Sequence, residues 1–391
     1  MENIIQASGH RLKFGNITHS DNCFVFDENG KRLVDLESGV WCTSVGHNNK
    51  RVNKLIASQI NRITHSGFCY CHPVIHEVSQ KVLEIAGLHG GKCEFLCSGS
   101  EAIEFGMRIA RTIVDKPLAL TFSDSYFGAY GEAAKRPKES WFVYNRLQCA
   151  CTVDDTGCKG ECDDFLNIPF DKTGIFLFEP GSSSGMVRFP SAVLIQKVVA
   201  KVRSNHGLII ANEITTGAGR TGKWFGYQHY NILPDIVAMG KGIGNGYPVS
   251  LTAISAEVAR KLGETRFLYA QSHQNDPLGA MVAGEVISII DEDGLLQNCI
   301  ETGNFLLAAL KKMQNEFAVI KAVRGRGLML AIEFERNALK VYEELLRKGF
   351  ILCWRPNTQV LRLDPALTVE PSTINEFLLA FKEVLENLSR D

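Results

Sequence analysis

Lys241 is the residue whose position in the chain points most clearly to a chemical role. It follows the apolar, strand-like run Ile236–Met239, and glycines occupy positions 240, 242 and 244 around it. A lysine at the end of a strand can point into a cleft, where a desolvated amine forms a Schiff base with an aldehyde. Pyridoxal phosphate (PLP) is the commonest such aldehyde. Most lysines are solvated surface residues, so this run alone leaves both interpretations open.

Three further segments precede Lys241 in the chain. They are Ser98-Gly99-Ser100-Glu101, Phe178-Glu179-Pro180 and a run from Leu208 through Asn212 to Gly222. With Lys241 they resemble the class III (subgroup II) PLP-dependent aminotransferases of fold type I, over nearly the whole chain. The resemblance implies that Lys241 carries PLP and acts as the catalytic acid–base. It also implies a transferase that moves an amino group from a primary amine or amino acid to a keto acid, pyruvate or 2-oxoglutarate, by a ping-pong mechanism.

The composition is that of an ordinary globular protein. The chain has 391 residues, of which 45% are hydrophobic and 22% charged, with a net charge of −1. This length supports two cores, and the balanced charge gives no reason to expect nucleic acid or a membrane as a partner. No leader-like segment stands at the N-terminus, and twelve cysteines fit a reducing compartment. We therefore expect a cytoplasmic protein that acts on small molecules.

Short apolar runs alternate with helical segments in the middle of the chain. This alternation predicts an α/β fold with a mainly parallel central sheet. The strand candidates are Leu118–Phe122, Gly174–Glu179, Gly207–Ile214, Asp235–Met239 and Leu251–Ser255, and the helix candidates are Ala102–Val114 and Ser191–Asn205.

The pattern changes after about residue 280 to long helices and a few strands. The helix candidates are Ala280–Ile290, Thr302–Phe317 and Pro371–Leu388, and the strands fall in Val323–Glu335, Gly349–Trp354 and Val360–Leu363. A hairpin is expected near the start, over Phe24–Asp27 and Arg32–Asp35. We expect a large PLP-binding domain over 46–275 and a smaller α+β domain over 276–391. By resemblance, an N-terminal segment over 1–45 packs with the smaller domain.

The phosphate of PLP needs a site for an anion. Ser98 and Glu101 have the spacing of a capping box, so a helix begins there. A helix N-terminus offers unpaired N–H groups and a positive dipole end, which suit a phosphate. An ordinary helix cap is the alternative. The resemblance makes Gly99 and Ser100 the phosphate binders.

The residues around the PLP ring are also implied by the resemblance. Tyr126 matches an aromatic residue that stacks on the ring, and Phe127 replaces a frequent family histidine. Glu179 and Asn212 follow strands, at the sheet edge where ligands bind. Asn212 stands where the family usually has an aspartate that keeps the pyridine nitrogen protonated, and an amide cannot carry that charge. Thr215 stands where many members have a glutamine.

Three residues are expected to meet the substrate. Arg362 matches the arginine that binds the substrate carboxylate, and a structural salt bridge is the alternative. Trp41 is a pocket wall or a core tryptophan. Ser184 stands where members that use both ω-amino donors and glutamate often carry a glutamate. The stretch around Ser184 is similar to the dialkylglycine decarboxylase branch, but Val40 replaces a glutamine of that branch, which argues against decarboxylation.

Ser272 and His273 match a segment that crosses a subunit interface in the family and touches the PLP phosphate of the neighbouring subunit. The resemblance therefore implies a homodimer with shared active sites. Two alternative functions stay open. The first is another PLP reaction on the same scaffold, by a lyase, a racemase or a decarboxylation-dependent transaminase. The second is a non-catalytic PLP- or metal-binding protein, against which Lys241 argues.

Four cysteines within fourteen residues fall outside the shared motifs: Cys149, Cys151, Cys158 and Cys162. Four thiolates on one loop can hold a tetrahedral zinc ion in a structural role. The C-x-C and C-x3-C spacings depart from the usual C-x2-C pairs. A loop of free thiols and a labile iron–sulfur centre are the alternatives.

Overall fold

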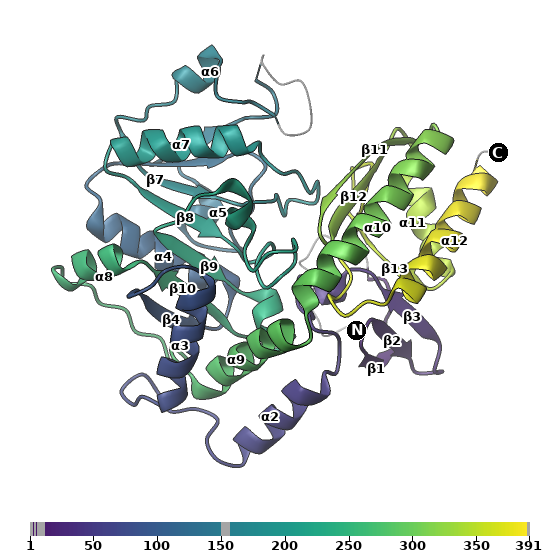
Figure 1. The fold of residues 1–391 in the computed structure, drawn as a ribbon, viewed down its shortest axis with the longest axis horizontal. Helices are drawn as coiled ribbons and strands as arrows, with labels where there is room; N and C mark the ends of the chain where they lie inside the picture. The colour runs from purple at the N-terminus through teal and green to yellow at the C-terminus, as the bar shows by residue number, and fades with distance from the viewer. Residues whose placement is uncertain (1–2, 4, 6–11, 150–156, 389–391) are drawn as a thin grey trace.

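A computed structural model describes residues 3, 5, 12–149 and 157–388 (Figure 1). Two groups of elements lie side by side in Figure 1. One surrounds a central sheet that contains β7 to β10, and the other contains β11, β12 and the helices α10 to α12. No helix of the described part is long and apolar enough to cross a membrane.

A seven-stranded sheet forms the centre of the larger group, in the order β4, β10, β9, β8, β7, β5, β6. The strands are Lys92–Leu96 (β4), Ser250–Ile254 (β10), Ile236–Met239 (β9), Leu208–Asn212 (β8), Thr173–Phe178 (β7), Leu118–Phe122 (β5) and Trp141–Tyr144 (β6). Neighbours from β9 to β6 run parallel, whereas β10 is antiparallel to β9 and to β4. The prediction of a mainly parallel sheet is confirmed.

The inner strands β5, β7, β8, β9 and β10 are buried on both faces, which explains why they are largely apolar runs. Ile175 and Leu177 of β7 pack with helix α4 (Gly99–Ile113), whereas Phe176 packs on the opposite face with α7 (Ala192–Ser204). Successive side chains of a strand point to opposite faces. The sheet is therefore held between two helical layers.

The other elements of this group cover the sheet or link its strands. The helices are α2 (Lys50–Ile60), α3 (Pro73–Ile85), α5 (Glu132–Lys135), α6 (Asp163–Leu166), α8 (Ala256–Gly263) and α9 (Pro277–Glu292), with 3-10 turns η1 (Gly226–Tyr230) and η2 (Lys241–Gly244).

The smaller group carries an antiparallel sheet in the order β11, β12, β15, β14. Its elements are β11 (Ile320–Arg326), β12 (Met329–Phe334), β14 (Cys353–Trp354), β15 (Val360–Leu363), α10 (Leu295–Glu316), α11 (Ala338–Arg347) and α12 (Pro371–Leu388).

The first strands of the chain pair with a strand from its last third. They are β1 (Ile17–Asp21), β2 (Phe24–Asp27) and β3 (Arg32–Asp35), and a short turn, α1 (Ser38–Trp41), follows them. Strand β3 runs parallel to β13 (Phe350–Ile351). The three-part division of the chain at residues 45 and 275 stays a prediction.

Several elements differ from those expected. The run Val323–Glu335 forms two strands, β11 and β12, because Gly327 adopts φ +57° in the turn between them. The run Gly349–Trp354 is divided between two sheets, as β13 and β14. The sequence analysis did not identify β4, β6, α2 or α3. Strands β4 and β6 form the two edges of the large sheet, where charged or exposed residues interrupt the apolar pattern, whereas α2 and α3 are amphipathic helices that the sequence interpretation missed.

Candidate active site

Eight of the predicted site residues line one cavity of about 220 Å³. They are Gly99, Ser100, Tyr126, Phe127, Glu179, Asn212, Thr215 and Lys241. Most of them follow the carboxyl ends of β5, β7, β8 and β9, which meet at one edge of the parallel sheet. Residues far apart in the sequence are thereby brought together.

The N-terminus of α4 forms one wall of this cavity. The capping box is present, because Ser98 Oγ accepts the Glu101 N–H and Glu101 Oε2 accepts the Ser98 N–H. In the described part of the chain, no acceptor is found for the N–H groups of Gly99 and Ser100. A Cβ at Gly99 would lie 2.9 Å from the Ile214 side chain, so the close turn needs glycine. These two N–H groups fit an anion such as a phosphate.

Asn212 and Glu179 form a buried, hydrogen-bonded pair at the ends of β8 and β7. Asn212 Oδ1 accepts the Ile214 N–H at 3.1 Å, and Asn212 Nδ2 donates to Tyr126 O at 3.1 Å and to Glu179 Oε1 at 3.3 Å. Glu179 also accepts from Ser183 Oγ at 2.5 Å. Burial raises the pKa of Glu179 to about 7, although hydrogen bonds from the Ser183 hydroxyl and from the backbone N–H groups of Tyr126 and Ser183 oppose the shift. The amide therefore donates one N–H to a carboxyl group whose pKa lies near neutrality and the other to the Tyr126 carbonyl.

Thr215 completes the polar lining of the cavity. Its Oγ1 atom is buried and has no hydrogen-bond partner among the described residues. A buried hydroxyl normally has a partner, so this atom indicates a polar ligand. With the two free N–H groups and the lysine, the donor set fits PLP.

Lys241 begins η2 in a left-handed conformation, with φ +47°. Its Nζ atom lies 5.4 Å from the ring centre of Trp41. Burial lowers the pKa of the Lys241 amine, and the charges of Arg362 and Arg355 lower it further, while Cys42 and Glu179 act in the opposite direction. A neutral amine is the form that attacks a carbonyl group.

Trp41 also contacts Arg362, whose Cζ lies 3.4 Å from the centre of the same ring. Arg362 Nε donates to Asp364 Oδ2 at 2.6 Å, and both side chains are buried. The salt bridge that was the alternative to substrate binding is thus present, and the substrate role of Arg362 stays a prediction. No bond to the two terminal nitrogens of Arg362 is found among the described residues. These nitrogens can still form a fork to a carboxylate.

The three predicted substrate-binding residues lie outside the Lys241 cavity, and one residue that influences Lys241 was not predicted from the sequence. Trp41, Arg362 and Ser184 do not line the Lys241 cavity, although Ser183, the neighbour of Ser184, does. Cys42 contributes to the electrostatics of Lys241 and was not predicted. The only sequence signal for it was its position next to Trp41.

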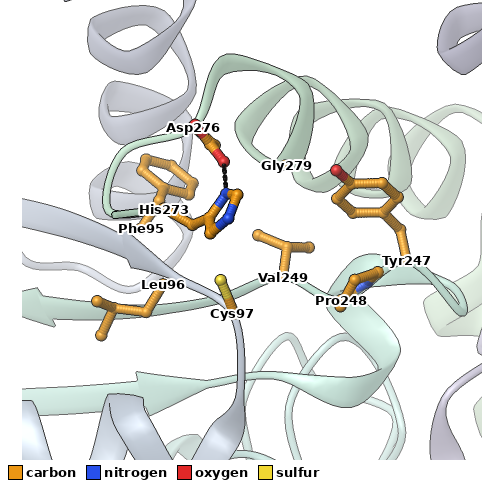
Figure 2. Close-up of a pocket in the computed structure, with 9 residues that line it drawn as sticks. All are labelled: Phe95, Leu96, Cys97, Tyr247, Pro248, Val249, His273, Asp276 and Gly279. Carbon is orange, nitrogen blue, oxygen red and sulfur yellow. Dashed lines mark hydrogen bonds and ion pairs between the residues drawn. The ribbon is translucent and has the colours of Figure 1, made fainter. Parts of the chain in front are cut away.

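Figure 2 shows a second cavity, of about 210 Å³, beside Cys97 and His273. His273 Nδ1 lies 2.6 Å from Asp276 Oδ2, and His65 Nδ1 lies 2.6 Å from the other oxygen, Oδ1. Ser272 and His273 are exposed and do not line the Lys241 cavity of their own chain.

Three of the four predicted metal ligands lie together. The sulfurs of Cys149, Cys158 and Cys162 are within 4.8 Å of one another, and we name these residues the cysteine cluster. Cys151 lies outside the described residues.

A family model described as aminotransferase class-III matches residues 5–134 and 155–385. The chain belongs to this family. An ornithine aminotransferase of Staphylococcus aureus strain MRSA252 is 29% identical, over 95% of this chain and 94% of the relative. A leucine/methionine racemase of Thermococcus litoralis is 28% identical, over 91% of this chain and 87% of the relative.

Solved structures agree with the family in fold. A Bacillus anthracis aminotransferase superposes with a TM-score of 0.88 at 22% identity, covering 98% of this chain and 96% of that one. The predictions of a fold type I transferase and of a PLP-dependent aminotransferase are therefore confirmed.

Proposed function

We propose that this class III aminotransferase transfers an amino group from a primary amine or amino acid to pyruvate or 2-oxoglutarate by a ping-pong mechanism. One observation carries the proposal: the buried Lys241 amine shares a cavity with the free N–H groups of Gly99 and Ser100, and the Trp41 ring centre lies 5.4 Å from that amine and 3.4 Å from Arg362 Cζ. Bound PLP would supply the aldehyde and the electron-withdrawing ring that amino transfer requires.

Each residue then has a defined task. Gly99 and Ser100 bind the phosphate through backbone N–H groups. Lys241 would hold PLP and would move the proton at the amine-bearing carbon. Asn212 and Glu179 would line the part of the site that receives the pyridine nitrogen, and Arg362 would bind the carboxylate of the acid substrate.

The remaining predicted residues would lie around the cofactor ring, on the substrate side and at the proposed subunit interface. Tyr126 and Phe127 would enclose the ring, Thr215 Oγ1 would donate a hydrogen bond to the cofactor, and Ser184 and Trp41 would shape the substrate side. A homodimer is supported by the exposure of Ser272 and His273, which leaves them available to a second subunit. A cytoplasmic location is supported by the twelve cysteines.

A racemase is the second candidate, because one relative carries that activity in its name. Asn212 favours it as well, since an amide cannot keep the pyridine nitrogen charged and so weakens the electron sink. Lys241 would then move the proton on one face of the carbon, and a proton would be delivered to the opposite face without loss of the amino group.

A donor screen distinguishes the two candidates. The holoenzyme is incubated with a panel of amines and amino acids, with pyruvate, with 2-oxoglutarate or with neither. Formation of a new amino acid from the keto acid supports aminotransfer. Loss of optical activity without any keto product would establish racemisation instead.

A further inference from the structure

The cysteine cluster brings three sulfurs to one point outside the Lys241 cavity. Cys149 Sγ lies 2.8 Å from Cys162 Sγ, which lies 3.5 Å from Cys158 Sγ. Cys149 and Cys158 are buried and Cys162 is half-buried. Structural cysteines usually pack singly as small apolar side chains. Three sulfurs converging on one point therefore require a specific reason.

The sulfur separations suit a single metal ion. Sulfurs bound about 2.3 Å from a tetrahedral zinc ion lie about 3.8 Å from one another. The Cys162 sulfur lies 2.8 Å from that of Cys149 and 3.5 Å from that of Cys158, and all three lie within 4.8 Å of one another, so outward shifts of about 1 Å or less would admit an ion. An iron–sulfur centre distributes its cysteines over several irons and so spaces them farther apart. The geometry favours a mononuclear site.

Neighbouring groups are arranged to stabilise thiolates. The Gly160 N–H points at Cys158 Sγ, with a distance of 3.1 Å, and the Tyr144 hydroxyl lies 3.8 Å from Cys162 Sγ. Gly160 has φ +72°, and a Cβ there would lie 3.1 Å from Lys197 Cδ. Donors to the ligating atoms are typical of metal sites, because they fix the ligands and tune their charge.

The cluster also lies where an ion would hold a loop in place. Cys149 follows β6, and Cys162 directly precedes α6. The Cys158 N–H donates to Arg146 O at 2.9 Å, and the Cys158 carbonyl accepts from Ser191 Oγ at the start of α7. The family match leaves out residues 135–154, which include Cys149, and covers Cys158 and Cys162. None of the three cysteines lines the Lys241 cavity, so the proposed chemistry does not account for this feature.

We propose that Cys149, Cys158 and Cys162 bind one zinc ion per chain in a structural role. Zinc prefers soft thiolate ligands in tetrahedral geometry, and three thiolates fill three of its four positions. Each thiol loses its proton to solvent when its sulfur binds, and no redox step occurs. Cys151, the fourth candidate in the sequence, lies outside the described residues. The ion would join the ends of β6, α6 and α7.

The test is the metal content of holoenzyme purified without added metal. We expect about one zinc per chain in the unaltered protein and a loss of at least about nine-tenths of it in the double variant Cys158→Ser, Cys162→Ser. Cys93→Ser is the matched control, because it removes a half-buried thiol that lies in β4, outside the cysteine cluster. This variant should retain about one zinc per chain.

A second measurement uses the unaltered chain and so does not depend on how the variant folds. Cobalt(II) exchanged for zinc should give thiolate-to-metal absorption in the near ultraviolet and the visible bands of a tetrahedral ion. Less than about a tenth of an equivalent of zinc, with all three thiols open to alkylation, would overturn the proposal. Iron with inorganic sulfide, or a Cys149–Cys162 disulfide in mass spectra, would also overturn it.

Discussion

The Lys241 cavity and the cysteine cluster are built in opposite ways. The cavity takes residues from the ends of four strands and from α4, spread between Gly99 and Lys241. The cluster takes three residues from one short segment, Cys149 to Cys162. The first depends on the whole sheet for its geometry, whereas the second is local. Changes in the cavity should therefore affect chemistry, and changes in the cluster should affect stability.

The largest expected effect is that of Lys241→Ala. Without the amine, covalent attachment of PLP is lost, and the turnover should fall by at least about a thousandfold, because the acid–base is gone. Borohydride reduction followed by mass spectrometry measures the attachment. Lys261→Ala, on the surface of α8, is the control and should keep both properties. A trapped adduct that persists in Lys241→Ala would contradict the assignment.

Arg362→Gln should have the next largest effect, through substrate binding. We expect kcat/KM for an α-amino acid to fall by about a hundredfold, since a charge-assisted fork is lost. A primary amine without a carboxylate is the matched control substrate, and its half-reaction should change far less. Equal losses for both substrates would indicate that Arg362 only pairs with Asp364. Because that pair is buried, the melting temperature of the variant must be measured too.

Asn212→Asp tests the electron sink. An aspartate can hold a protonated pyridine nitrogen, so exchange of the substrate α-proton in heavy water should rise by about tenfold. The new carboxylate would face Glu179 at the 3.3 Å of the present pair, and like charges raise each other's pKa. The double variant Asn212→Asp, Glu179→Gln should therefore exchange the α-proton faster than the single variant Asn212→Asp. If exchange is unchanged in both, ring protonation does not limit the reaction.

The sequence predicted the local features of the site better than its contacts. The apolar runs of β7, β8 and β9 and the capping box of α4 are local patterns that placed Glu179, Asn212, Lys241 and Gly99 at strand and helix ends, whereas their roles came from the resemblance to the family. The contact of Trp41 with both Lys241 and Arg362 could not be predicted, because it joins three distant segments through tertiary packing. The proximity of Cys42 to Lys241 was missed for the same reason.

The reactivity of the Lys241 amine should depend on pH in a way that reports its burial. Because burial lowers the pKa of this amine, its neutral form should dominate at a lower pH than the ordinary lysine value of 10.5. Labelling of the apoprotein by pyridoxal and borohydride should then reach half its maximal rate below pH 10.5. Between the lowered pKa and 10.5 the unfolded chain binds more protons, so this residue makes stability rise with pH. A midpoint at or above the ordinary value would indicate an exposed, charged amine.

The smallest expected change in activity is that of the variant Cys158→Ser, Cys162→Ser. Its turnover per bound PLP should stay within about twofold of the unaltered enzyme, because neither residue lines the Lys241 cavity. Its free energy of unfolding should fall by several kcal/mol, since binding of a structural zinc ion contributes directly to folding. Removal of zinc from the unaltered protein by a chelator should lower its melting temperature. Added zinc should then restore the melting temperature of the unaltered protein and should not raise that of the double variant. A large fall in turnover with an unchanged melting temperature would contradict the separation of the two regions, because the cluster would then act on the chemistry.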